Sequence, residues 1–145
     1  MSSLLRNHEA QQFRIRMQHC ATETGLRLNA VNDGSAQLKF DLGKGRSQAI
    51  RVVDVGDRLR FVAHVVPEFE SVDDVPDFLS TNLLQENNGS RLGYWTLYKN
   101  SSGVLNYMID YTVPEVAVTP SFFKQIMVDI LGHCETYYDF LDSLG

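Results

Sequence analysis

The chain has 145 residues and a formal net charge of −5, and 43% of its residues are hydrophobic. This length fits one domain, 1–145, and the apolar fraction argues against disorder. The acidic balance disfavours nucleic acid as a partner, because phosphate backbones repel it. No apolar stretch reaches the roughly 18 residues of a membrane span, and no secretory signal opens the chain, so we expect a cytoplasmic protein without a membrane partner.

Apolar residues spaced by three and four predict a first helix that ends near Gly25: Phe13, Met17, Cys20 and Ala21. The period then changes to two, as in β-strands, over 26–30, 36–42, 47–55 and 58–65. Turn sequences, of which Asn32-Asp33-Gly34-Ser35 is the strongest, separate these segments. The pattern predicts an antiparallel meander of three or four strands, with one apolar face and one mixed face.

The second half of the chain predicts two further helices and a hairpin. Pro76 can open a second helix, with an apolar stripe that includes Phe78 and Leu83. Strands over about 91–98 and 104–111 follow, and Thr119-Pro120 then caps and opens a third, long helix. The order of helix, meander, helix, hairpin and helix predicts an α+β fold in which three helices pack on an antiparallel sheet.

Three joints of this order carry a resemblance. They are Leu83-Leu84-Gln85-Glu86-Asn87 at the end of the second helix, Val113-Pro114 after the hairpin, and Tyr137, Tyr138 and Phe140 in the last helix. Over nearly the whole chain, the sequence resembles the type III secretion chaperone fold, which also includes the YbjN-like proteins. The resemblance implies a secretion-chaperone-like sandwich and a bacterial homodimer that holds an extended client segment. The YbjN-like branch implies a sensory or regulatory interaction domain instead.

Both faces of the predicted hairpin are apolar, which a strand pair buried on only one side does not require. We place four residues together on the second face: Trp95, Leu97, Val104 and Met108. Exposed apolar patches of this size are uncommon on monomers, so we interpret this face as a dimer interface. The alternative is that a helix of the same chain covers it.

The mixed face of the meander is the predicted client surface. Valines alternate there with basic side chains: Val53, Val55, Arg58, Arg60, Val62 and His64. An extended client could lay apolar residues over such a face, or add a strand to its edge. The alternative is an ordinary solvated face whose valines reflect strand propensity.

The remaining motifs do not predict chemistry. His19-Cys20 and His133-Cys134 offer zinc-type ligands, but adjacent helical residues point about 100° apart. The acidic stretch over 68–77 lacks the pattern of a calcium loop and suits a helix start. No nucleotide or nucleophile motif is present. We therefore predict no metal, no cofactor and no enzyme; a small enzyme or small-molecule binder is the alternative from another class.

Overall fold

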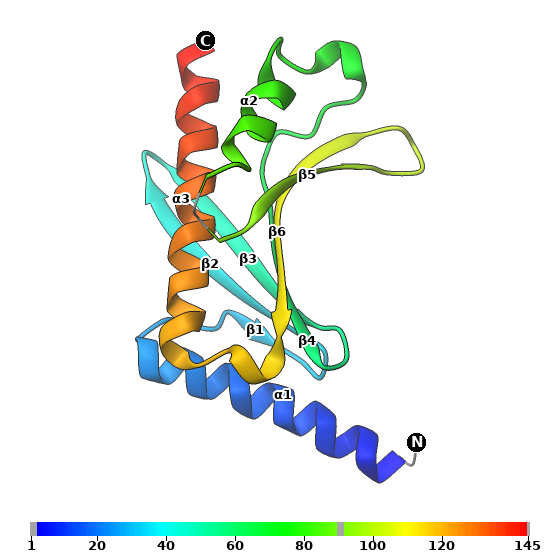
Figure 1. Cartoon of the computed structure of the whole chain (residues 1–145), viewed down its shortest axis with the longest axis vertical. Helices are drawn as coiled ribbons and strands as arrows, with labels where there is room; N and C mark the ends of the chain where they lie inside the picture. The colour runs from blue at the N-terminus through cyan, green and yellow to red at the C-terminus, as the bar shows by residue number, and fades with distance from the viewer. Residues whose placement is uncertain (1–2, 90–91, 145) are drawn as a thin grey trace.

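The computed structural model describes residues 3–89 and 92–144. Its helices are α1 (Ser3–Thr24), α2 (Leu79–Glu86) and α3 (Pro120–Leu144), with short 3-10 turns η1 (Val72–Asp74) and η2 (Glu115–Ala117). Its strands are β1 (Ala30–Val31), β2 (Ser35–Gly43), β3 (Arg46–Asp54), β4 (Arg58–His64), β5 (Tyr94–Lys99) and β6 (Leu105–Pro114). The predicted α+β class and the predicted order of elements are confirmed (Figure 1).

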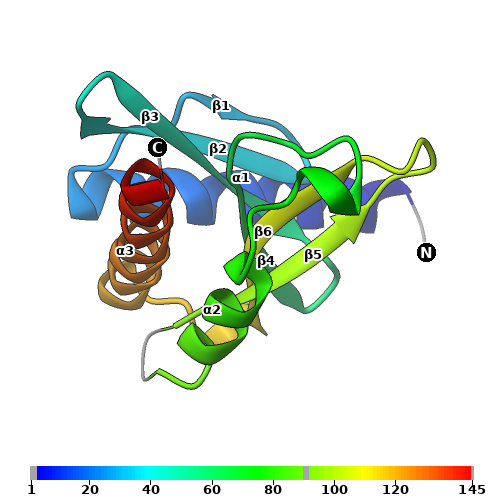
Figure 2. The same ribbon diagram turned by 90° about the horizontal axis from the view of Figure 1, so that it is seen from above.

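The strands form one antiparallel sheet in the order β1-β2-β3-β4-β6-β5. Because β6 pairs with β4, the second hairpin extends the first meander instead of forming a separate layer. Helices α2 and α3 lie on one side of the sheet, and α1 runs across one end of it (Figures 1 and 2). The sheet therefore has an inner face toward the helices and an outer face that the described helices leave open.

The core lies between the inner face and α3. The apolar residues of α3 recur every three or four positions and are buried, as the sequence predicted. Thr119 caps this helix, because its Oγ1 accepts the backbone N–H of Phe122 at 3.1 Å. None of the helices in the described ranges combines the length and apolar character of a membrane span. The largest side chains of the core come from all layers: Phe13, Met17, Leu38, Ile50, Phe61, Ile109, Phe123 and Tyr137.

The second helix begins three residues later than predicted. Pro76 does not open it: Val75 is extended, as residues before proline usually are, and it closes η1. Phe78 has a φ of 67°, in the left-handed region, so it cannot continue a helix from Pro76. The helix starts at Leu79, and the side chain of Phe78 is 76% exposed instead of belonging to the apolar stripe.

The first predicted strand is also shorter than expected. The alternation over 26–30 gives only Ala30–Val31 in strand form. Before it, the side chain of Asn29 accepts the backbone N–H of Lys39 at 2.7 Å and takes the place of a main-chain partner. An edge strand that stops in this way exposes little unpaired backbone. The predicted start of the hairpin near 91 lies outside the described residues, and β5 begins at Tyr94.

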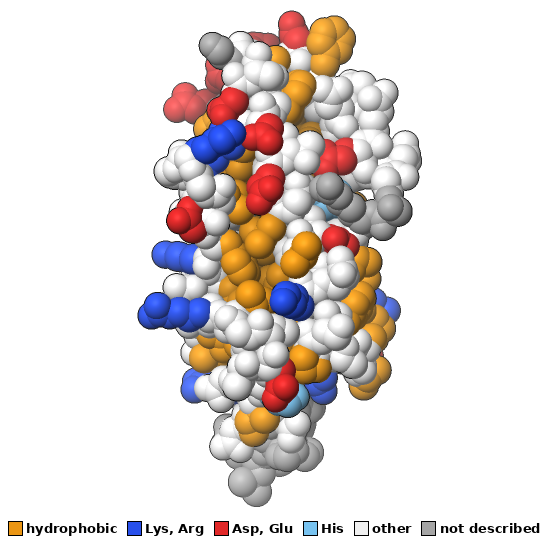
Figure 3. Space-filling model, turned by 90° about the vertical axis from the view of Figure 1, so that its left-hand side faces the viewer, with side chains coloured by type: hydrophobic (Ala, Val, Ile, Leu, Met, Phe, Trp, Pro, Cys, Tyr) orange, Lys and Arg blue, Asp and Glu red, His pale blue; other side chains and the backbone are white. Residues whose placement is uncertain are grey.

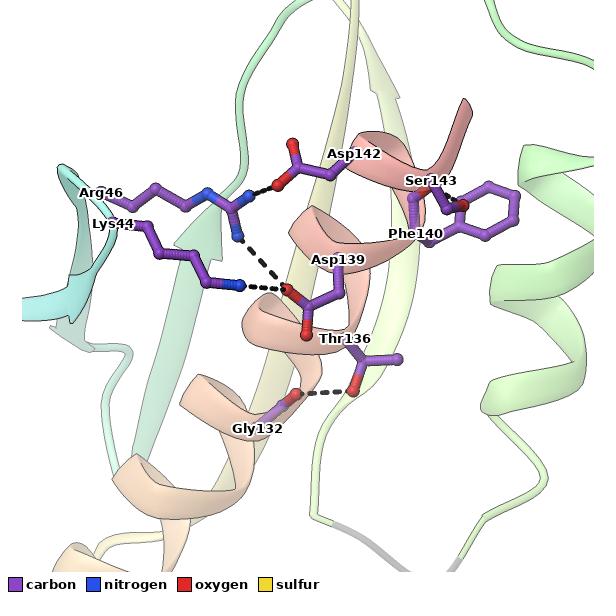
Figure 4. Close-up of polar contacts among 8 residues, drawn as sticks. All are labelled: Lys44, Arg46, Gly132, Thr136, Asp139, Phe140, Asp142 and Ser143. Atoms are coloured by element: carbon purple, nitrogen blue, oxygen red, sulfur yellow. Dashed lines mark hydrogen bonds and ion pairs between the residues drawn. The ribbon is translucent and has the colours of Figure 1, made fainter. Parts of the chain in front are cut away.

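The turn between β2 and β3 is held beside the end of α3 by charged side chains (Figure 4). Arg46 pairs with Asp142 and with Asp139, the latter at 3.5 Å, and Lys44 Nζ lies 4.0 Å from Asp139. The Arg46 guanidinium also lies 5.5 Å from the ring centroid of Tyr138. Exposed ion pairs contribute only about 0–1 kcal/mol each, so these contacts position the turn more than they stabilise the fold.

Candidate functional site on the outer sheet face

The strand register places the predicted client surface on one face. Arg51 lies opposite Val62, and Val53 lies opposite Arg60. Because side chains alternate along a strand, residues two positions away point the same way. The outer face therefore carries Val53, Arg58, Arg60, Val62 and His64, while Val55 lies 47% exposed just beyond β3. The structure brings these residues together as expected, and their binding role remains a prediction.

Arg60 is not a free cation of this face. Its Nε lies 3.0 Å from both oxygens of Asp110, and its Nη2 lies 2.5 Å from Oδ2. The hydrogen bond to Asp110 raises the pKa of Arg60 above its ordinary value. The sequence could not reveal this pair, because Asp110 lies 50 positions further along the chain. In contrast, the side chains of Arg51 and Arg58 are exposed and have no polar partner among the described residues.

A hollow of about 570 Å³ opens on the outer face where β3 and β4 separate. Main-chain pairing between these strands ends at Arg51 and Val62. Beyond that point, the amide of Gln48 donates to the carbonyl of His64 at 2.9 Å. Gln48 Oε1 in turn accepts the Tyr138 hydroxyl at 2.8 Å. This buried network bridges the strands from behind, so the hollow is a pocket with a fixed floor.

The predicted grouping of the hairpin residues is wrong. Trp95 pairs with Ile109 and lies on the inner face, whereas Met108 pairs with Thr96 and lies on the outer face. Trp95 is 4% exposed, with its ring 5.2 Å from that of Tyr137 in α3, and Met108 is 8% exposed. A shift of one position in register exchanges every side chain between the two faces, and the sequence pattern did not fix that register.

Trp95 and Met108 therefore cannot form a shared apolar surface, and α3 of the same chain covers Trp95. Of the four residues predicted for a dimer interface, Leu97 keeps the largest exposure, at 50%, and Val104 is half-buried before β6. For Trp95, the alternative stated above is therefore correct: a helix of the same chain covers its side chain. The apolar side chain of the predicted interface that stays most exposed, Leu97, lies on the edge strand β5.

The backbone groups on the free edge of β5 have a hydrogen-bond partner at the start of the strand and none further along it, within the described residues. Asn87 occupies it at Trp95: its Oδ1 accepts the Trp95 N–H at 2.6 Å, and its Nδ2 donates to the Trp95 carbonyl at 3.2 Å. Since backbone groups alternate along a strand, those of Leu97 and Lys99 point toward the same edge, beyond the reach of Asn87. The outer part of the strand is therefore available for pairing.

An exposed leucine of α2 lies beside this open edge. Ser80 bonds the hydroxyl of Tyr107, the partner of Leu97, and Asn87 bonds Trp95. Leu84 lies four residues after Ser80 and three before Asn87, hence on the same helix face between two contacts to the hairpin. Leu84 is 65% exposed. Leu84 and Leu97 together form what we call the α2–β5 edge.

A second apolar surface lies over α3. Figure 3 shows apolar side chains gathered in the middle of that side of the molecule, with acidic side chains above them. Val128 of α3 is 53% exposed, and Leu131 is half-buried. This surface lacks the alternation of unpaired arginines and valines that distinguishes the outer sheet face.

The histidine and cysteine pairs do not converge. His133 is buried, with its Nδ1 2.6 Å from Glu86 Oε1, while His19 is exposed on α1. Burial raises the pKa of the Cys134 thiol to about 12, and the pKa of Cys20 is raised for the same reason. Within the described ranges, no three side chains of His, Cys, Asp or Glu are grouped so that they could hold a metal ion.

No family model and no curated protein matches the chain. Two solved structures do. A chain of the HopA1–SchA chaperone–effector complex has 13% sequence identity and a TM-score of 0.60, and the match covers 90% of this chain and 95% of that one. A chain of the ExsC–ExsE complex has 14% identity and a TM-score of 0.56, with 89% and 92% covered. At this identity the likeness establishes the fold alone, and the fold is type III secretion chaperone-like, as the sequence predicted.

Proposed function

We propose that this protein is a chaperone-like binding protein that holds an extended segment of a client protein, and that it acts by binding and not by catalysis. The observation that carries the proposal is the outer face. In a chain with a net charge of −5, it presents Arg51 and Arg58, which have no polar partner among the described residues, beside valines on a sheet surface that the described helices leave open. The fold shared with a chaperone–effector complex supports the same function.

The outer face suits an extended client for two reasons. Its side chains repeat with the spacing of a β-strand, which an extended segment shares, so alternate client side chains can meet the sheet at regular intervals. Its floor is apolar at Val62, which is 4% exposed, and its rim carries positive charge. Apolar contact then contributes affinity, and the unpaired arginines contribute orientation and attract acidic segments.

Client capture from this face can be tested with a photo-crosslinking amino acid in native cells. We expect a crosslinker at Val53 to yield a defined protein adduct, and Arg58→Glu to reduce that adduct several-fold by reversing an unpaired charge. Arg58 is preferable to Arg60, because reversing Arg60 would leave the buried Asp110 beside a like charge. The adduct is identified by mass spectrometry and quantified by immunoblot.

The matched controls lie away from the outer face. A crosslinker at Val116, which is 88% exposed on η2, should give no such adduct, and Lys124→Glu on α3 makes the same charge change without an effect. If the adduct forms equally at Val116, or if Arg58→Glu leaves it unchanged, the outer face is not the client surface.

We further propose that two copies pair through the α2–β5 edge. Leu84 and Leu97 are both exposed, on a helix and an edge strand that Ser80 and Asn87 join. Burying such side chains and the open strand edge against a second copy removes apolar surface and unpaired backbone from water together. The symmetric arrangement of a two-fold dimer allows one patch to serve both subunits. This edge takes the place of the interface predicted at Trp95 and Met108.

The dimer is tested by sedimentation or light scattering at several protein concentrations. We expect Leu97→Glu to convert the dimer to a folded monomer, because it places a charge in the buried contact, and Leu84→Glu to do the same. The control Val116→Glu replaces an exposed apolar residue of η2, away from the α2–β5 edge, and should remain dimeric. A wild-type protein that sediments as a monomer at all concentrations, or a Leu97→Glu variant that stays dimeric, contradicts this interface.

A further inference from the structure

The pocket on the outer face is lined by one guanidinium and one imidazole, those of Arg51 from β3 and His64 from β4. His64 lies two positions beyond Val62, the cross-strand partner of Arg51, so Arg51 and His64 lie diagonally across the two strands. Both side chains line the pocket that opens where the two strands separate, so one bound group in it can contact both. Ala49, two positions from Arg51, keeps the space between them open.

The orientation of His64 is fixed by a second hydrogen bond. Its Nδ1 lies 2.5 Å from Asn106 Oδ1, and Asn106 Nδ2 donates to the carbonyl of Val65 at 2.9 Å. Because the amide group of Asn106 must donate to that carbonyl, its oxygen is the acceptor, and the hydrogen of the imidazole lies on Nδ1. Nε2 of His64 is left for a ligand, as an acceptor when the ring is neutral.

The charge of the pocket is unbalanced. Arg51 has no ion pair within the described part of the chain, and none of the described residues that line the pocket is acidic. The lining instead combines small apolar side chains with amides such as Gln37. A guanidinium with free donors beside an apolar floor is the arrangement that recognises a carboxylate.

We propose that this pocket seats the carboxylate of a glutamate or aspartate in the client segment. Arg51 donates hydrogen bonds to the carboxylate, and Nε2 of His64 accepts a backbone N–H of the same segment. Apolar residues at alternate positions of the segment contact the outer face, where Val66 is 62% exposed beside the pocket. The assignment rests on the proposed function and adds to it a residue class: an acidic side chain within an extended, otherwise apolar stretch.

The test uses synthetic fluorescent peptides that alternate valine and threonine around one central residue, which is glutamate, glutamine or lysine. Binding is measured by fluorescence anisotropy. We expect the glutamate peptide to bind about tenfold more tightly than the glutamine peptide, as for one charge-assisted hydrogen-bonded contact. Arg51→Glu should reverse the preference toward the lysine peptide. Lys124→Glu, the same charge change on α3 away from the outer face, should leave the preference for glutamate unchanged.

The assignment is overturned if glutamate and glutamine peptides bind alike, if Arg51→Glu leaves the preference unchanged, or if no peptide binds. None of these results contradicts the proposed function if the crosslink from Val53 still forms. Failure of the carboxylate assignment can therefore be distinguished from failure of the proposed function. A change of oligomeric state in the Arg51→Glu variant would also overturn the assignment. It would mean that the pocket binds an acidic segment of a second copy of this chain and not of a client. Circular dichroism checks that the variant, which is altered at an exposed position, is folded.

Discussion

Replacing Trp95 with alanine should lower the free energy of unfolding by about 3–5 kcal/mol, the usual cost of removing a large aromatic side chain from a core. Trp95 is 4% exposed and packs against Tyr137 and His133 of α3. Its loss opens a cavity between the sheet and α3, beside the rings of Tyr137 and His133. Urea denaturation followed by far-ultraviolet circular dichroism measures the effect. Tryptophan fluorescence cannot serve as the probe, because the variant lacks the protein's one tryptophan.

Two companion variants make this result specific. Tyr98→Ala removes an aromatic ring that is 55% exposed on the same strand, and it should cost about 1 kcal/mol or less. Trp95→Phe should cost less than Trp95→Ala, because the indole N–H has no hydrogen-bond partner among the described residues. Equal, small losses for Trp95→Ala and Tyr98→Ala would mean that Trp95 is a surface residue, as the sequence pattern first indicated.

The protein should lose stability steeply above pH 9. Burial raises the pKa of Cys134 from 9.0 to about 12, and burial also raises the pKa values of Tyr137 and Tyr138 above 10.0. Above pH 9 the unfolded chain releases the thiol proton while the folded protein keeps it. The unfolded state then binds fewer protons, so the free energy of unfolding falls, by about 1.4 kcal/mol per pH unit for each such group.

Urea titrations between pH 7 and 11 check this dependence. The free energy of unfolding should be insensitive to these groups below pH 9 and fall between pH 9 and 10 through the buried thiols of Cys134 and Cys20. It should fall faster above pH 10, where Tyr137 and Tyr138 of the unfolded chain also lose their protons. Cys134→Ala should weaken the decline between pH 9 and 10, leaving the part that Cys20 contributes, and keep the steeper decline above pH 10. A wild-type protein equally stable at pH 7 and pH 10.5 would show that these groups are exposed to solvent.

The local pattern of the sequence predicted most elements because local forces decide them. Thr119-Pro120 opens α3 and the stripe from Phe123 faces the sheet, since capping and the helical period act within a few residues. Where a local rule competed with another, the prediction failed. Pro76 could open a helix, but η1 before it and the left-handed Phe78 after it moved the start to Leu79.

The predicted client surface was found because alternation along a strand assigns faces without knowledge of the partner strand. Its charges could not be assigned in the same way. Asp110, which lies 50 positions after Arg60 in the sequence, neutralises it across the sheet. Arg51 and Arg58 are then the cations of this face that have no polar partner among the described residues. The hollow beside Arg51 depends on the separation of β3 from β4, which no spacing in the sequence indicates.

By itself, the sequence determined the class of fold, the order of the elements and the two faces of the meander, because propensity, capping and periodicity are properties of neighbouring residues. Only the tertiary structure decided the register of β5 on β6, which puts Trp95 and Met108 on opposite faces, and it decided separately that Leu97 and Leu84 remain exposed. The reason is physical: when both faces of a hairpin are apolar, alternation fits two registers equally well, and only packing against the helices selects one.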